Sequence, residues 1–125
     1  RLFGEYDGYG PGEHTRDFIY VKDVVKVNFY FWEHPEISGI FNCGTGNAHQ
    51  FNTLAKGVLK HFGSGELEYV PFPEVLKGKY QSFTQADTTN LLAAGYDGGF
   101  TPIEDAIAEY CALLDKTGGY YVYER

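Results

Sequence analysis

Apolar residues recur at the spacing of an amphipathic helix along two stretches of the chain, and we predict helices at 24–34 and 52–62. Asp23 stands directly before the first stretch, where its side chain is suited to cap the helix, and Pro35 ends that stretch. Gly63 follows the second stretch, in the place where glycine commonly terminates a helix.

Two further helices are predicted from the residues at their ends. The segment 101–116 begins with Thr101 as N-cap, and Glu104 completes a capping box three positions later. A shorter helix at 88–94 follows Asp87 as its capping residue. Each of these side chains can accept a hydrogen bond from the first backbone N–H groups of a helix, which otherwise have no partner.

Three segments have the pattern of short strands. Residues 16–21 and 37–42 are rich in β-branched and aromatic side chains, and residues 66–72 alternate polar and apolar positions. The order strand, helix, strand, helix, strand, helix, helix is typical of an α/β fold. The glycine-rich segment 4–14 is predicted to be a long loop, and residues 120–125 (YYVYER) receive no assignment.

Length, composition and charge narrow the class of protein. The 125 residues fit one domain, and 43% hydrophobic with 22% charged residues is the composition of a folded globular chain. The formal net charge of −7 argues against a nucleic-acid partner, which requires a basic face. No run of about 18 apolar residues is present, so the sequence predicts no membrane span. Because the chain contains no Met, we expect it to be a piece of a longer polypeptide.

The cysteines and histidines do not form a recognisable metal site. Cys43 and Cys111 lie far apart without a CxxC motif, and we predict two buried free thiols in a reducing, intracellular setting. The four histidines are scattered, and we predict surface or helix-end positions for them rather than a metal site: His14, His34, His49 and His61.

Two segments could bind an anion. The glycines of the sequence GTG at 44–46 follow a predicted strand, which suits either a phosphate-binding loop or a tight strand-to-helix turn; the turn is favoured because His49 stands where a dinucleotide fingerprint needs glycine. Arg16 follows the glycine-rich loop and could contact a phosphate with both arms of its guanidinium, or form an ion pair with Asp17 or another nearby carboxylate.

The segment 77–87 (KGKYQSFTQAD) is the second concentration of donors. Lys77 and Lys79 supply positive charge, and the Tyr80 hydroxyl supplies a donor on a rigid ring. If the fold brings Lys77, Lys79 and Tyr80 close to Arg16, these residues would together frame a diphosphate. No GxSxG, HExxH or YxxxK pattern is present, so the chain shows no catalytic apparatus of those kinds.

The sequences RDFIYVKDVV, FNCGTGNAHQF and YVPFPEVLKGKYQSFTQADTTNLLAAGY together resemble the C-terminal part of the ADP-L-glycero-D-manno-heptose 6-epimerases, a family of extended short-chain dehydrogenases/reductases. The first two sequences are shared loosely by many nucleotide-sugar epimerases and dehydratases, and the third is more specific. The resemblance implies that residues 1–125 are the nucleotide-sugar-binding domain of an α/β enzyme, with short strands alternating with helices and without its Rossmann half.

The resemblance also implies roles for individual residues. Arg16 and Tyr80 match family residues that contact the nucleotide-sugar, and Phe3 matches the phenylalanine at the start of the substrate-binding loop. NADP and the catalytic Tyr and Lys belong to the family's Rossmann half, so no catalytic, cofactor-binding or metal residue is predicted in this chain. The segment 77–87 would form a wall of the substrate pocket.

The activity implied by the resemblance is inversion of C6″ of an ADP-heptose, a precursor of the lipopolysaccharide core, in the cytoplasm. We expect an ADP-sugar substrate, a partner Rossmann half, and homo-oligomers formed through exposed apolar surface, with no nucleic-acid or membrane partner. A chain with the substrate half alone is not expected to be active. The alternatives are the substrate domain of another nucleotide-sugar 4-epimerase or dehydratase, which would prefer UDP, GDP or dTDP, and a non-catalytic nucleotide-sugar-binding module.

Overall fold

The computed structural model describes residues 1–119 as four α-helices, one 3₁₀ helix and four short strands. Residues 120–125, for which the sequence predicts no helix or strand, lie outside the described residues. In chain order the elements are β1 (Leu2–Phe3), β2 (Thr15–Arg16), α1 (Val21–Glu33), β3 (His49–Gln50), α2 (Phe51–Phe62), β4 (Tyr69–Val70), η1 (Glu74–Leu76), α3 (Thr89–Ala93) and α4 (Ile103–Thr117). The mixed α/β class predicted from the sequence is confirmed.

The strands form two small pairs rather than one continuous sheet. β1 lies parallel to β4, with Leu2 opposite Tyr69 and Phe3 opposite Val70, and β2 lies antiparallel to β3. A single parallel bridge joins Thr15 to Phe83 on the other side of β2. The bridge brings the middle of the 77–87 segment beside a residue nearly 70 positions earlier in the chain.

The predicted strands were too long, and one of them was wrong. Of the segment 16–21 only Arg16 lies in a strand, and of 66–72 only Tyr69–Val70 does. The segment 37–42 contains no strand at all. A strand requires a neighbouring strand for its backbone hydrogen bonds, and β-branched or aromatic content alone does not supply one.

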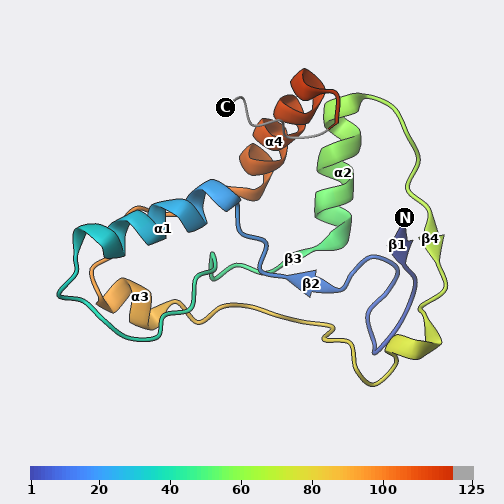
Figure 1. The fold of residues 1–125 in the computed structure, drawn as a ribbon. Helices are drawn as coiled ribbons and strands as arrows, with labels where there is room; N and C mark the ends of the chain where they lie inside the picture. Colours follow the sequence, from blue (N-terminus) through green and yellow to red (C-terminus); the bar gives the residue numbers. More distant parts are fainter. Residues whose placement is uncertain (120–125) are drawn as a thin grey trace.

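The predicted helices are all present, with ends shifted by a few residues. α2 ends at Gly63, which adopts the left-handed conformation with φ of 67°, and α4 ends in the same way at Gly118. Helices α2 and α4 lie side by side (Figure 1). A Cβ on Gly57 would lie 2.9 Å from Ile107 Cδ1, so the glycine allows this close approach.

A small aromatic core sits under α1. Val27, Leu91 and Tyr96 are buried together, and four half-buried aromatic side chains pack against them: Tyr30, Phe31, Phe41 and Phe100. The Tyr30 hydroxyl donates a 2.6 Å hydrogen bond to the Ala94 carbonyl at the end of α3. α1 and α3 therefore form one end of the molecule, and β1 and β4 lie at the other (Figure 1).

The predicted cap at Asp23 was wrong in its location. Asp23 lies inside the first turn of α1, whose N-cap is Tyr20. Its buried carboxylate accepts hydrogen bonds from the backbone N–H and hydroxyl of Thr101, at 2.7 and 3.0 Å, and from Lys26 Nζ at 2.8 Å. The capping box predicted for Thr101 does not form either, since Pro102 is the N-cap of α4. Asp23 instead ties the start of α4 to α1.

The sequence predicts neither a membrane span nor a metal site, and these two expectations can be compared with the described part of the chain only. Among residues 1–119 no helix is both long and apolar enough to cross a membrane. In the same residues no group of three or more His, Cys, Asp or Glu side chains is arranged to hold a metal ion.

Candidate functional site

Five aromatic side chains gather where β1, the 4–14 loop and the 77–87 segment meet. The Phe3 ring lies 5.2 Å from Phe72 and 5.9 Å from Tyr80, both edge to face. Tyr6 stacks on Phe72 with ring centroids 3.9 Å apart. His14 lies edge to face with Tyr80 at 5.3 Å. Edge-to-face and offset pairs of this kind stabilise by about 0.5–1.5 kcal/mol each beyond the area they bury.

Backbone pairing explains why these rings meet. The parallel β1–β4 pair places Phe3 beside the segment that leads into Phe72. The glycine-rich loop then turns back on itself, because Gly12 donates a 2.9 Å hydrogen bond to the Phe3 carbonyl. The Tyr6 hydroxyl accepts a 2.6 Å hydrogen bond from the Gly78 N–H, which fixes the 77–87 segment against the loop. The loop is therefore an ordered wall of the site.

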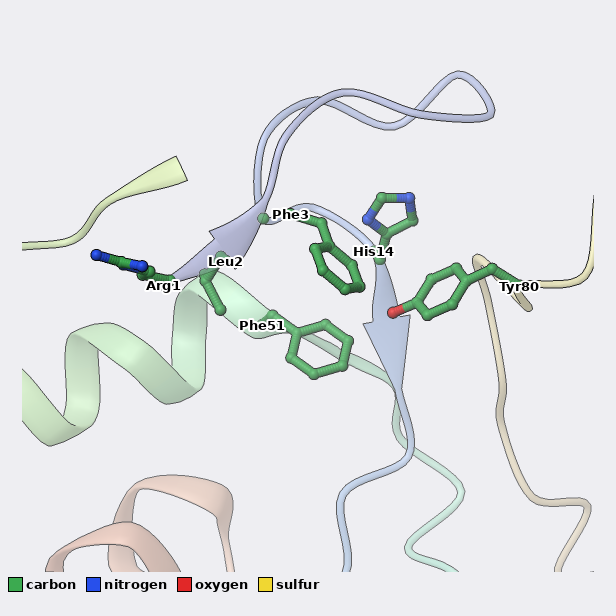
Figure 2. A pocket seen from close by; sticks show the side chains of 7 residues that line it. Arg1, Leu2, Phe3, His14, Phe51 and Tyr80 are labelled. Atoms are coloured by element: carbon green, nitrogen blue, oxygen red, sulfur yellow. The ribbon is translucent and has the colours of Figure 1, made fainter. Parts of the chain in front are cut away.

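Three of these rings, those of Phe3, His14 and Tyr80, border a cavity of about 210 Å³. Its lining is mostly apolar and aromatic: Arg1, Leu2, Phe3, Gly12, His14, Phe51 and Tyr80. Figure 2 shows Phe3 and Phe51 on one side and Tyr80 entering from the opposite side, with its hydroxyl directed toward them. Pockets for drug-sized ligands are about 300–1,000 Å³, so this cavity suits one flat part of a larger ligand.

Arg16 lies directly beside this cavity. Its Cζ atom is 4.8 Å from the centre of the Tyr80 ring and 5.8 Å from that of Phe51. One guanidinium nitrogen donates a 2.7 Å hydrogen bond to the Thr15 carbonyl. No carboxylate among residues 1–119 lies within 4.0 Å of Arg16, so the alternative of an ion pair with Asp17 is wrong.

The three residues predicted as a substrate site are thus brought together. Phe3 and Tyr80 are in ring contact, and Arg16 lies over Tyr80. Their positions in the sequence gave no reason for this proximity, which results from the β1–β4 pair and the Thr15–Phe83 bridge. Whether the three bind a nucleotide-sugar remains a prediction.

Asp17 organises the GTG loop. Its carboxylate accepts four hydrogen bonds, from the Thr45 N–H at 2.9 Å, the Thr45 hydroxyl at 2.5 Å, the Gly46 N–H at 2.9 Å and the Ala86 N–H at 3.0 Å. Burial is the largest single influence and raises the pKa of Asp17, but the hydrogen bonds together outweigh it, so the pKa is lowered. The N–H groups of Thr45 and Gly46 are therefore already engaged, which argues against a phosphate-binding loop. The predicted tight strand-to-helix turn is not found either, because residues 37–43, directly before the loop, form no strand and β3 separates the loop from α2.

The two lysines of the 77–87 segment, Lys77 and Lys79, do not line the cavity. Lys77 Nζ lies 2.5 Å from a Glu74 carboxylate oxygen, and both side chains are largely exposed. Lys79 is exposed, and neither lysine lines the cavity beside Arg16. Arg16 contacts the Tyr80 ring, and Tyr80 is the residue of this segment that reaches the site.

Two other predictions for single residues were wrong. His14 was expected at the surface, but it is 1% exposed and surrounded by rings. Its neighbours in the glycine-rich loop gave no sign of burial, because the partners Phe72 and Tyr80 come from distant segments. Cys43 was expected to be buried, but it is exposed because the segment around it is not a strand; Cys111 is buried as predicted.

Comparison with known proteins relates part of this chain to a family of enzymes. Residues 5–44 match the model of the NAD dependent epimerase/dehydratase family. This match covers residues 5–14 of the glycine-rich loop, β2 and α1, and therefore includes Arg16 of the candidate site. The chain has the mixed α/β fold of nucleotide-sugar epimerases.

Two solved structures are particularly similar. One is a UDP-N-acetylglucosamine 4-epimerase from Methanobrevibacter ruminantium M1 in complex with UDP-N-acetylmuramic acid, with 24% identity and a TM-score of 0.71 over 87% of this chain and 34% of that one. The other is the ADP-L-glycero-D-manno-heptose-6-epimerase of Helicobacter pylori, with 26% identity and a TM-score of 0.69 over 83% of this chain and 31% of that one. This chain spans about a third of each.

Proposed function

We propose that this chain is the nucleotide-sugar-binding part of an epimerase of the extended short-chain dehydrogenase/reductase type. The observation that carries the proposal is the Arg16 guanidinium, which has no carboxylate partner among residues 1–119 and is set against an aromatic-walled cavity. An aromatic-walled cavity suits a nucleobase, and an adjacent arginine suits the diphosphate attached to it. A sugar-nucleotide has both groups in that order.

Each side chain has a distinct task in this proposal. Phe3, Phe51 and Tyr80 form the walls against which a flat base packs. Arg16 binds the diphosphate with its two-armed donor geometry, while its stacking on Tyr80 keeps it oriented before the ligand arrives. The Tyr80 hydroxyl donates to a ligand oxygen within the cavity. Hydride transfer is supplied by a nicotinamide cofactor, for which we assign no residue of this chain.

The substrate that we propose is an ADP-heptose, inverted at C6″. Two observations support this choice: the 77–87 sequence resembles that of the heptose 6-epimerases, and a solved enzyme of that activity shares the fold at 26% identity. The second candidate is a UDP-sugar 4-epimerase, which is favoured by the similarity to the Methanobrevibacter enzyme. The two candidates differ in the nucleobase, and hence in the group placed in the aromatic cavity.

Calorimetric titration of this chain with ADP-, UDP- and GDP-glucose tests the proposal. Arg16→Ala should weaken binding of the preferred sugar-nucleotide by about 1.5–3 kcal/mol, or tenfold or more, because a hydrogen-bonded charge partner is lost. Arg16→Lys should restore only part of the affinity, since the ammonium lacks the two-armed geometry.

A matched control separates the specific role from the general effect of charge. Lys56→Ala removes an exposed cation on α2, outside the cavity beside Arg16, and should leave affinity unchanged. An equal loss in the Lys56 and Arg16 variants, or a loss below tenfold for Arg16→Ala, would count against the assigned role. A preference for UDP-glucose would select the 4-epimerase candidate.

A further inference from the structure

His14 is a buried polar side chain without a hydrogen-bond partner in the described part of the chain. It is 1% exposed, and among residues 1–119 no donor or acceptor lies within reach of its buried Nε2 atom. Buried polar groups nearly always have a partner, because a group that leaves water without gaining a new bond destabilises the fold. An imidazole in this position therefore costs stability, and a ligand that bonds to it would remove that cost.

The location of His14 distinguishes it from two similar groups. The hydroxyl oxygens of Thr15 and Ser82 are also buried without a partner among residues 1–119. Of these three residues, His14 is the one that lines the cavity of about 210 Å³. The charged lining residue Arg1 already pairs with Glu68, at 2.7 Å. His14 therefore places an unused hydrogen-bonding group at the wall of the cavity.

The rings around His14 hold it in a fixed orientation. Tyr9 stacks on the imidazole with ring centroids 5.4 Å apart, and Phe72 lies 5.8 Å away at a tilt of 41°. Figure 2 shows one of the two ring nitrogens on the side of Phe3, which is another wall of the cavity. Since these rings cover the faces of the imidazole, a ligand in the cavity meets its edge, which carries the donor and acceptor nitrogens.

His14 and Arg16 are placed as two contacts for one nucleotide. The Phe51 N–H donates a 3.1 Å hydrogen bond to the His14 carbonyl, which fixes the segment beside the cavity. Both side chains contact the Tyr80 ring, His14 edge to face at 5.3 Å and Arg16 with its Cζ atom 4.8 Å from the ring centre. Residues two apart in an extended segment point to the same side and are separated by about 6.6 Å. A ribose bridges a similar length between a base and its diphosphate.

We propose that His14 is the specificity-determining residue of this site: its imidazole edge hydrogen-bonds the edge of the nucleobase while Arg16 binds the diphosphate. The inference rests on the proposed function and adds the residue that distinguishes one base from another. An aromatic wall packs on the face of any base and therefore distinguishes the bases poorly. A hydrogen bond to the base edge discriminates, because a base that cannot form it leaves the buried imidazole unpaired.

Replacement of His14 by phenylalanine tests the proposal, since a ring is kept and the nitrogens are removed. In calorimetric titration with ADP-, UDP- and GDP-glucose, His14→Phe should weaken binding of the preferred sugar-nucleotide by about tenfold and bring the three affinities closer together. Affinity for inorganic pyrophosphate, which has no base, should be unchanged in His14→Phe and reduced in Arg16→Ala. The Tm of His14→Phe should equal or exceed that of the wild type, because an unpaired buried polar group is removed.

Two conservative variants and one control complete the test. The amides of His14→Asn and His14→Gln can replace Nδ1 and Nε2 respectively, and one of the two variants should regain part of the base preference. No recovery in either variant would count against a hydrogen bond. Tyr9→Phe is the control, since Tyr9 packs on His14 but is not among the residues that line the cavity. It should leave both the affinity and the base preference unchanged.

Other results overturn the proposal in distinguishable ways. If the wild type binds sugar-nucleotides without a base preference, or if His14→Phe keeps the wild-type preference, the inference about His14 fails and the proposed function stands. If the wild type binds no sugar-nucleotide, the proposed function fails and the inference fails with it. His14→Leu replaces His14→Phe in the titration if the phenylalanine variant does not fold. Failure of both variants to fold would show that the imidazole is needed for the structure itself, and would overturn the proposal.

Discussion

Replacement of Asp17 by asparagine should strongly destabilise the fold, although Asp17 lies outside the hydrophobic core. The carboxylate holds three segments together, through two hydrogen bonds from Thr45, one from Gly46 and one from Ala86. Asparagine keeps the shape but turns one acceptor oxygen into a donor. Whichever way the amide is placed, two of the four donors then face an NH₂ group.

The expected magnitude follows from those two lost bonds. A hydrogen bond to a charged acceptor contributes about 1.5–3 kcal/mol, and the lower figure applies because Asp17 is only half-buried. Two such bonds give a loss of about 3 kcal/mol, which is a large part of the 5–15 kcal/mol typical of a domain. Urea denaturation at pH 7 should show a lower midpoint with an unchanged slope.

The pH dependence provides the stricter test. The pKa of Asp17 is lowered in the folded state, so its stabilising contribution is complete above the ordinary carboxyl range near pH 4 and is lost as the pH falls through the folded value. The stability difference between the wild type and Asp17→Asn should therefore shrink on acidification. Asp97→Asn, at an exposed aspartate, should have little effect at any pH. The reasoning fails if Asp17→Asn costs less than about 1 kcal/mol or if the difference is independent of pH.

Other substitutions test the core, the 44–46 loop and the thiols. Leu91→Ala should lower the free energy of unfolding by about 2–5 kcal/mol, measured in urea, because Leu91 is fully buried; a loss below about 1 kcal/mol would show that the core is loosely packed. Gly44→Ala should lower Tm in a thermal melt, since its Cβ would collide with that of Ala86, and an unchanged Tm would refute the close packing. Thiol titration with a disulfide reagent should modify Cys43 in the folded protein and Cys111 only on unfolding; equal rates would contradict the burial of Cys111.

The helices could be predicted from the sequence because their signals are local. Periodic apolar residues and the glycine after α2 act within a few turns of the chain, and the predicted helices formed. The prediction failed where a side chain acts across the fold. Asp23 has the chemistry of a helix cap, but its partner is Thr101, 78 positions away. No local pattern distinguishes a residue that caps its own helix from one that binds the start of another.

In the candidate site, too, local chemistry could be predicted from the sequence, but contacts between distant segments could not. The donor chemistry of Arg16 and Tyr80 was visible in the sequence, but their proximity was not, because it depends on the bridge between Thr15 and Phe83. The burial of His14 was missed for the same reason. Short strands are poorly marked in a sequence, since a strand of two residues exists only where a distant segment pairs with it.

Arg16 is available to bind an anion because the carboxylate of the neighbouring Asp17 is engaged by other hydrogen-bond donors. Asp17 is the nearest acid along the chain, and in a chain of net charge −7 an arginine without an ion-pair partner in the described part of the chain needs an explanation. Neighbouring residues of an extended segment point to opposite sides, so Arg16 faces the rings of Phe51 and Tyr80 while Asp17 faces the 44–46 loop. The four donors around Asp17 then compete with Arg16 for that carboxylate and satisfy it. A guanidinium resting on aromatic faces keeps its charge and is held in place, so little ordering entropy remains to oppose anion binding. The affinity for a sugar-nucleotide should accordingly depend on the charge of Arg16 and, under conditions where the Asp17→Asn variant is still folded, be nearly independent of the charge at position 17.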